Sequence, residues 1–489
     1  MNTPLIIAID QGTSSCRAML VDALGQIIGI EQKEFSQYFP QSDWVEHDAN
    51  EIWETQMEVL DKLIENHVQN IDLIAGIGIT NQRETTVVWN KETGEPVYNA
   101  IVWQDKRTSA YCKSLKEDGF EEYVFNNTGL TIDPYFSGTK LKWILDNIEC
   151  DISEICFGTI DSWLIWKMTQ GKKHVTDHTN ASRTLLYNIK TLKWDDHILE
   201  KLEIPKTLLP KVQNSASQFG IFRYKGSNIP ITGVAGDQQA ALFGQACFNK
   251  GAAKNTYGTG CFMLMNVGEK FVASENGLLT TLCCNDRGEV AYALEGSIFV
   301  AGAAIQWLRD GLKIIKDTSE TDAIAESIKD QNDVIVVPAF SGLGAPYWNM
   351  DSRGAIFGLT RASGVEQIVK ATLDALAYRT KDVLDAMSKD SGMPLRILKV
   401  DGGACKNNYL MQFQSDILQT DVERPENIES TAMGAAYLAG LTLGMWDAQL
   451  ISENRKIERT FVRKKGKEIQ KELYAKWQKA IERSLDWME

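Results

Sequence analysis

A short polar segment follows an apolar run close to the N-terminus. Residues 5–9 are apolar, and Asp10-Gln11-Gly12-Thr13-Ser14-Ser15 then supplies a carboxylate, a glycine and three hydroxyl groups. Backbone N–H groups of a tight turn can converge on an anion, and a neighbouring carboxylate can hold a metal ion that the anion shares. The segment therefore indicates a site for a metal–phosphate ligand, with an ordinary hairpin with a polar tip as the alternative.

A second segment repeats this pattern about half a chain later. Residues 255–265 read as a strand, a turn at Gly258-Thr259-Gly260 and another strand. Gly-Thr turns are common, so chance is one explanation of the similarity. The other is a duplication that gives each half of the chain one phosphate-binding hairpin. A boundary near Phe248 would then divide the chain into domains 1–248 and 249–489.

Other polar groups stand where apolar segments end. Arg83 and Glu84 follow the segment 73–79, and such a pair can donate to and accept from the hydroxyl groups of a polyol. Asp237 follows the segment 229–232, where a carboxylate can deprotonate an attacking hydroxyl group. The alternatives are a surface ion pair for Arg83 and Glu84, and a helix N-cap for Asp237.

Together these groups match the needs of phosphoryl transfer. That reaction uses a base, a metal ion that neutralises the phosphates, and donors for the transition state. Asp237, Asp10 and Arg17 are residues of the required types. Paired glycines at 402–403 would also let a flat ligand approach the backbone closely.

The elements that must position these groups alternate between strand and helix patterns. Alternation of this kind is typical of a layered α/β fold. Strands are predicted at 73–79, 229–232, 334–337 and 397–400, and helices at 50–67, 238–247, 303–312, 365–387 and 432–443. We also interpret the apolar run 298–308 as a buried helix.

Composition narrows the class of protein and its partners. A chain of 489 residues predicts about two to four domains. The net charge of −14 would repel nucleic acids and anionic membranes, whereas a small anion such as ATP needs only local positive groups. The nine cysteines show no C-x-x-C pair, which favours reduced thiols in a cytosol. We expect no membrane span, since no apolar stretch approaches about 18 residues, and no signal peptide.

Taken together, these segments resemble the glycerol kinases of the carbohydrate-kinase family, which shares the ATPase fold of actin and the heat-shock chaperones. The similarity runs from residue 5 to residue 463, and its most specific stretches are 78–85, 133–140, 236–244, 254–265 and 411–416. The resemblance implies an α/β protein of two actin-like (ribonuclease H-like) ATPase domains with an active-site cleft between them. It also implies ATP- and Mg²⁺-dependent phosphorylation of glycerol to sn-glycerol 3-phosphate, in a cytoplasmic protein that forms dimers or tetramers.

The resemblance further implies roles for single residues. Asp237 would be the general base, and Asp10 would hold Mg²⁺ through water. The residues implied to contact glycerol are Arg83, Glu84, Trp103, Tyr135, Asp237, Gln238 and Phe262. Those implied to contact the phosphates or line the nucleotide pocket are Thr13, Ser14, Ser15, Arg17, Thr259, Gly302, Gln306, Gly403 and Asn407. Cys16 stands where the family usually has serine, and because it lacks a good donor we leave it out of this set.

Two other functions are compatible with the same fold. A kinase for another polyol or a ring sugar would need a wider pocket than Trp103 and Tyr135 favour. An ATP-driven switch or chaperone would need a further peptide-binding domain, for which we expect little room after the second core.

Overall fold

The apolar run after the N-terminus becomes the central strand of a mixed sheet in the computed structural model, which describes residues 3–328 and 333–488. Ile6, Ile7, Ala8 and Ile9 are buried because helices cover both faces of this sheet. The strands, from edge to edge, are β13 (Ala216–Tyr224), β14 (Ser227–Gly236), β5 (Ile74–Asn81), β1 (Leu5–Gln11), β2 (Ser15–Asp22) and β3 (Ile27–Glu34).

A second sheet repeats this topology. In each sheet a central strand, β1 or β15, has two or more antiparallel strands on one side and two parallel strands on the other. The second sheet has the order β17 (Leu279–Cys284), β18 (Val290–Ile298), β16 (Cys261–Gly268), β15 (Ala253–Tyr257), β21 (Ile397–Asp401), β22 (Asp421–Pro425) and β23 (Ile457–Phe461). The second sheet differs in that β16 pairs with β18, so β17 lies at the edge. The two hairpins noted in the sequence occupy equivalent places in this repeat, so their similarity is not chance.

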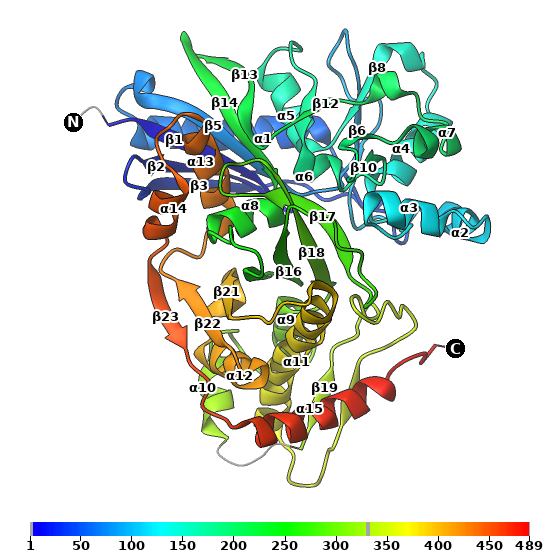
Figure 1. The fold of residues 1–489 in the computed structure, drawn as a ribbon, viewed down its shortest axis with the longest axis vertical. Coiled ribbons are helices and arrows are strands. Elements are labelled where there is room, and N and C mark those ends of the chain that lie inside the picture. The colour runs from blue at the N-terminus through cyan, green and yellow to red at the C-terminus, as the bar shows by residue number, and fades with distance from the viewer. Residues whose placement is uncertain (1–2, 329–332, 489) are drawn as a thin grey trace.

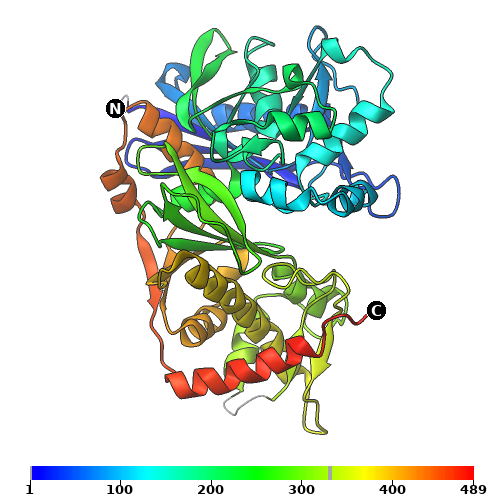
Figure 2. The same ribbon diagram turned by 45° about the vertical axis from the view of Figure 1, so that its right-hand side comes forward.

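The two sheets form two lobes, and one helix pair crosses between them (Figures 1 and 2). α13 (Ser430–Thr442) and α14 (Ala448–Asn454) follow the second sheet in the chain, yet both views show them beside the strands of the first sheet. α13 packs closely on α8 (Asp237–Gly244), where an added Cβ on Gly434 would overlap the carbonyl oxygen of Ala240. Small residues therefore fix the position of α8, which begins with Asp237.

A further layer, formed by β4 and by most of the chain between β5 and β13, carries part of the site. It comprises β4 (Glu46–His47), β6 (Val87–Asn90), β7 (Ala100–Ile101), α2 (Ser109–Glu117), α3 (Glu121–Thr128), α4 (Ser137–Asn147), β8 (Ile155–Gly158), β9 (Val175–Asp177), α6 (His178–Ala181), β10 (Tyr187–Asn188), β11 (Lys193–Trp194), α7 (Asp196–Lys201) and β12 (Lys211–Gln213). α1 (Ala49–His67) and α5 (Ile160–Met168) pack on the first sheet. β17 docks on this layer, since Thr280 N donates to Gly129 O at 2.9 Å.

The remaining elements cover the second sheet. They are α9 (Gly302–Asp310), α10 (Glu320–Ser327), β19 (Ile335–Val337), β20 (Ala355–Phe357), α11 (Val365–Ser391), α12 (Asn408–Leu418) and α15 (Lys467–Glu482). Within the described ranges, no helix is long and apolar enough to span a membrane.

The structure confirms the predicted strands and helices but corrects two of the interpretations. The run 298–308 is not one helix, because β18 ends at Ile298 and α9 starts at Gly302; the turn between them donates Ala301 N to Thr259 O at 2.9 Å. Asp237 is not a helix cap: Gly236 holds that position, and Asp237 is the first residue of α8.

The crossing of α8 and α13 generates a stability prediction. Gly434→Ala forces a methyl group against backbone, which cannot rotate away, and should destabilise the protein by about 3 kcal/mol. Thermal unfolding followed by circular dichroism measures this. Gly466→Ala is the matched control, because Gly466 has an ordinary φ of −72° and no atom within 4 Å of an added Cβ. Equal midpoints for the two variants would contradict the close packing.

Candidate active site

Arg83 and Glu84 occupy a buried turn directly after β5. Each side chain is only 2% exposed, so the alternative of a surface ion pair is wrong. Arg83 Nη1 and Nη2 donate to the two carboxylate oxygens of Glu295 at 2.7 and 2.8 Å, and its Nε lies 3.1 Å from Asp237 Oδ1. Glu84 has φ of 62°, in the left-handed region, which turns its side chain back beside the guanidinium.

Two members of this charged cluster are absent from the set predicted from sequence. Arg183 Nε donates to Glu84 Oε1 at 2.7 Å, and Arg183 Nη2 lies 3.1 Å from Glu295 Oε1. Burial alone would raise the pKa of Glu295, yet the two guanidinium groups hold it at about 2. Burial raises the pKa of Glu84. The sequence does contain a signal for Glu295, because this residue is the one acid in the otherwise largely apolar segment that forms β18.

Three aromatic rings form a wall beside these charges. The ring centroids of Trp103 and Tyr135 are 5.6 Å apart, and those of Trp103 and Phe262 are 6.4 Å apart. Phe262 lies on β16 of the second sheet, so both lobes contribute to the wall. Trp103 Nε1 donates to Thr13 Oγ1 at 2.9 Å, which ties the wall to the first hairpin.

Asp237 is the accessible acid of the cluster. Its side chain is 31% exposed, whereas Arg83 is buried beside it. Gln238 Nε2 donates to Asp237 Oδ2 at 2.9 Å, and Lys254 Nζ in turn donates to Gln238 Oε1 at 2.6 Å. Burial lowers the pKa of Lys254 to about 8. The carboxylate is thus held by neighbours while keeping a face open for a hydroxyl proton.

The first hairpin presents its polar groups outward. Ser15 Oγ accepts from Gln32 Nε2 at 3.0 Å, and Arg17 forms an ion pair with Glu429, which precedes α13. Cys16 is fully buried, and its thiol lies 3.6 Å from the carbonyl oxygen of Ile52 on α1. Its side chain therefore faces the core and not the tip of the turn.

The carboxylate of Asp10 is a suitable ligand for a hard cation that also binds phosphate groups. Among the described residues, none donates a hydrogen bond to its carboxylate. Burial, then the charges of Asp237 and Glu429, raise the pKa of Asp10 to about 7 against the opposing effect of Arg17. The described part of the chain offers no group of three acid, cysteine or histidine side chains for a metal. Phosphate oxygens and water would therefore supply most ligands of a Mg²⁺ ion.

The second hairpin meets the predicted nucleotide residues. Gly302 N donates to Gly258 O at 3.0 Å, which places the start of α9 against the hairpin. Gly402, with φ of 81°, packs on the backbone of Tyr257, while the neighbouring Gly403 is open to solvent. Thr259, Gly302 and Gly403 thus gather at one end of the second sheet.

Two other predicted nucleotide residues differ in their surroundings. Gln306 is exposed on the second turn of α9. Asn407 already has structural partners: its Oδ1 accepts from Leu410 N at 2.8 Å as the cap of α12, and its Nδ2 donates to Thr321 Oγ1 at 3.1 Å. Contact with a nucleotide would require Asn407 to share or exchange these bonds.

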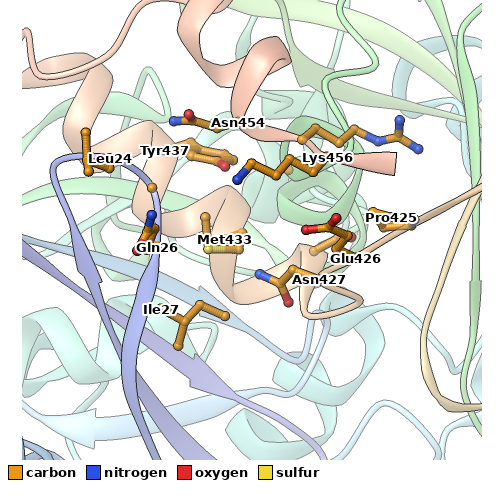
Figure 3. A pocket seen from close by; sticks show the side chains of 14 residues that line it. Leu24, Gln26, Ile27, Pro425, Glu426, Asn427, Met433, Tyr437, Asn454 and Lys456 are labelled. Carbon is orange, nitrogen blue, oxygen red and sulfur yellow. The ribbon is translucent and has the colours of Figure 1, made fainter. Parts of the chain in front are cut away.

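A cavity of about 290 Å³ lies between the β2–β3 turn, α13 and the segment 425–427 (Figure 3). Leu24, Gln26 and Ile27 line one side of it, and Glu426 and Asn427 the other. None of the residues predicted to bind glycerol or nucleotide lines this cavity.

Comparison with known proteins identifies the family. Residues 5–244 match the N-terminal domain of the FGGY family of carbohydrate kinases, and residues 253–443 match its C-terminal domain. The chain belongs to the FGGY family of carbohydrate kinases. The expected two-domain, actin-like α/β fold is confirmed.

Glycerol kinases are among the similar FGGY proteins. The glycerol kinase of Alkaliphilus metalliredigens is 58% identical over 99% of this chain and 98% of its own length. The glycerol kinase of Escherichia fergusonii is also 58% identical, with the same coverage. The solved structure of Plasmodium falciparum glycerol kinase with ADP superposes with a TM-score of 0.91 at 38% identity, over 99% of this chain and 98% of that one. The resemblance inferred from sequence motifs is confirmed.

The orientation of the Cys16 side chain toward the core leads to a prediction for this FGGY kinase. Cys16→Ser places a hydroxyl group in the core, so it should lower stability by about 1–3 kcal/mol. The KM for ATP should stay within about twofold of wild type, because the side chain of residue 16 points away from the tip of the first hairpin. Thermal unfolding and steady-state kinetics measure the two effects. A markedly lower KM for ATP would show that residue 16 does contact the nucleotide.

Proposed function

We propose that this carbohydrate kinase transfers the γ-phosphoryl group of ATP to glycerol, giving sn-glycerol 3-phosphate and ADP, as the first step of glycerol catabolism. The observation that carries the proposal is the identity of 56–58% with glycerol kinases over 99% of the chain. The small, charged and aromatic-walled site supports it. A triol has few apolar atoms, so selection depends on paired hydrogen bonds in a dry pocket.

Glycerol would lie between the charged cluster and the aromatic wall. Arg83 donates to its hydroxyl groups, and Glu84 accepts from them. Trp103 and Phe262 pack on the carbon chain. The remaining polar contacts come from Tyr135, Asp237 and Gln238. The buried state of Arg83 and Glu84 supports these roles, since an unpaired hydroxyl group beside a buried charge is costly.

Asp237 is the general base of the proposed reaction. Its carboxylate accepts the proton of the attacking hydroxyl group as that oxygen bonds to the γ-phosphorus and the bond to ADP breaks. The exposed face of Asp237 supports this role. Arg83 and Gln238 support it further, because they fix the carboxylate from the opposite side.

The nucleotide would be held by the two hairpins. Thr13, Ser14, Ser15 and Arg17 take the β- and γ-phosphates from one lobe, and Thr259 takes them from the other. Arg17 exchanges Glu429 for phosphate oxygens in this proposal. Gly302, Gln306, Gly403 and Asn407 line the adenosine pocket. Asp10 would hold Mg²⁺ through water, and that ion would supply the charge that neutralises the phosphates.

Three further properties are proposed on the family likeness. The chain divides into domains 1–248 and 249–489, forms dimers or tetramers, and acts in the cytoplasm. All nine cysteines are free thiols in the structure, which supports a reducing compartment.

A kinase for a larger polyol or sugar is the competing function. The close spacing of Trp103, Tyr135 and Phe262 favours a small substrate. A coupled ADP-release assay with glycerol, dihydroxyacetone, a pentulose and gluconate tests the choice. Glycerol should give the highest kcat/KM and should be required for most ADP release. A higher kcat/KM for the pentulose or gluconate would refute glycerol as the substrate, and ADP release without any acceptor would favour an ATP-driven switch.

The role of Asp237 is tested by Asp237→Asn. Loss of the base should lower kcat by roughly 10²–10⁴. Circular dichroism should show an unchanged fold, because the amide keeps the shape of the side chain. A kcat close to that of wild type would remove Asp237 from this role.

The role of Arg83 is tested by Arg83→Ala. The KM for glycerol should rise by more than about tenfold, while the KM for ATP changes by less than about twofold. Arg287→Ala, which removes an exposed arginine on the β17–β18 turn, is the control and should change neither KM. A selective rise of the KM for ATP in the Arg83 variant would mean that Arg83 binds the nucleotide instead.

A further inference from the structure

Two buried side chains of opposite charge lie directly behind Arg83 and Glu84. Glu295 comes from β18 of the second sheet, and Arg183 follows α6 in the first lobe. Both are completely buried. Glu295 is bonded to Arg83 and Arg183 is bonded to Glu84, so each can act on a substrate through the residue that it holds.

Glu295 fixes the guanidinium of Arg83. Its two oxygens accept from both terminal nitrogens of Arg83, and Gln239 Oε1 accepts a further bond from Nη1 at 3.2 Å. The Nε edge is left facing Asp237 at 3.1 Å. A bidentate pair of this kind specifies the plane of the guanidinium as well as its position.

Arg183 holds the carboxylate of Glu84 through a single hydrogen bond. Its Nε donates to Glu84 Oε1 at 2.7 Å, and its guanidinium carbon lies 5.7 Å from the ring centroid of Tyr135. Among the described residues, neither Nη1 nor Nη2 of Arg183 has a hydrogen-bond partner, and Nη2 keeps only its ion-pair contact with Glu295 at 3.1 Å. Arg183 is thus buried with only part of its hydrogen-bonding capacity used, and its contacts are directed at Glu84, Glu295 and the rings.

The charges alternate through the cluster in the order Asp237, Arg83, Glu295, Arg183 and Glu84. Both acids contact both guanidinium groups, but Glu295 is close to each, at 2.7 Å from Arg83 and 3.1 Å from Arg183, whereas Glu84 is close only to Arg183, at 2.7 Å, and lies 3.8 Å from Arg83. Without the charge of Glu295, the two buried cations would share only Glu84 and would repel each other more strongly. Arg83 and Glu84 would then no longer be held in a fixed arrangement beside each other.

The second lobe holds Glu295 in place through the docking of its edge strand. Thr281 Oγ1 lies 3.1 Å from Ser182 Oγ and accepts from Gln239 Nε2 at 3.2 Å. β17 pairs with β18, so these contacts with the first lobe fix the strand that carries Glu295.

We propose that Glu295 and Arg183 are positioning residues for polyol selection: Glu295 orients Arg83, and Arg183 orients Glu84, so that a fixed donor and a fixed acceptor face the substrate hydroxyl groups. The proposal rests on the glycerol-binding role proposed above for Arg83 and Glu84. It adds a contribution of the second lobe to a recognition pair that lies wholly in the first.

A double-mutant cycle tests whether Glu295 acts through Arg83. Glu295→Gln should raise the KM for glycerol by more than about tenfold and leave the KM for ATP within about twofold. In an Arg83→Ala background the same substitution should change kcat/KM for glycerol by less than about threefold, because the group to be oriented is gone. Full additivity of the two effects would overturn the proposal.

A matched control variant distinguishes the loss of a positioning contact from a general loss of stability. Asp382 is a buried acid of the second lobe that pairs with Arg379 at 3.0 Å and belongs to a different cluster. Asp382→Asn should lower the thermal midpoint without a selective rise of the KM for glycerol. A similar selective rise in this variant would show that loss of any buried charge suffices, and would overturn the proposal.

Arg183→Lys provides a second test if Glu295→Gln does not fold. Lysine keeps the charge but lacks the planar fork, so the KM for glycerol should rise while the KM for ATP does not. An unchanged KM for glycerol would overturn the role of Arg183. If the substrate panel selects another polyol, the proposed function fails, and the cycle repeated with that polyol still decides the positioning role.

Discussion

The bidentate ion pair between Glu295 and Arg83 joins the two lobes at the candidate substrate site. Burying either charge alone would be strongly unfavourable, so each residue requires the other in place. The second sheet must therefore deliver Glu295 to the first lobe, and the docking of β17 makes this possible. This pairing between the lobes orients Arg83, whose Nε in turn faces Asp237.

The site consists of two parts with different physical requirements. In the part assigned to glycerol, Arg83 and Glu84 are buried and bonded to protein groups, and the aromatic rings beside them are half-buried. The part assigned to the nucleotide consists of exposed groups such as Ser14, Thr259 and Gly403 at strand ends. A highly charged ligand with its own metal ion can organise such groups when it binds. The repeated sheet topology places one such hairpin in each lobe.

Features set by local pattern could be predicted from the sequence, and features set by distant contacts could not. The strand before Asp10 and the helices follow from hydrophobic periodicity, and alternation along β2 also accounts for Cys16 facing the core between Ser15 and Arg17. The residue types of Arg83 and Glu84 indicated a polyol-binding pair but left a surface ion pair as the alternative, because nothing in the local pattern shows that the pair is buried. Glu295 was missed because its partner lies 212 residues away. The break at 299–301 depends on carbonyl groups of the second hairpin.

Calorimetric titration of nucleotide-free protein with glycerol tests the central claim most directly. Because the polyol part of the site is formed by contacts between the lobes alone, one glycerol should bind per chain without nucleotide. Addition of ADP should change that affinity by less than about tenfold. Absence of glycerol binding until ADP is added would contradict the account, since it would mean that the nucleotide, and not the ion pair between Glu295 and Arg83, assembles the site.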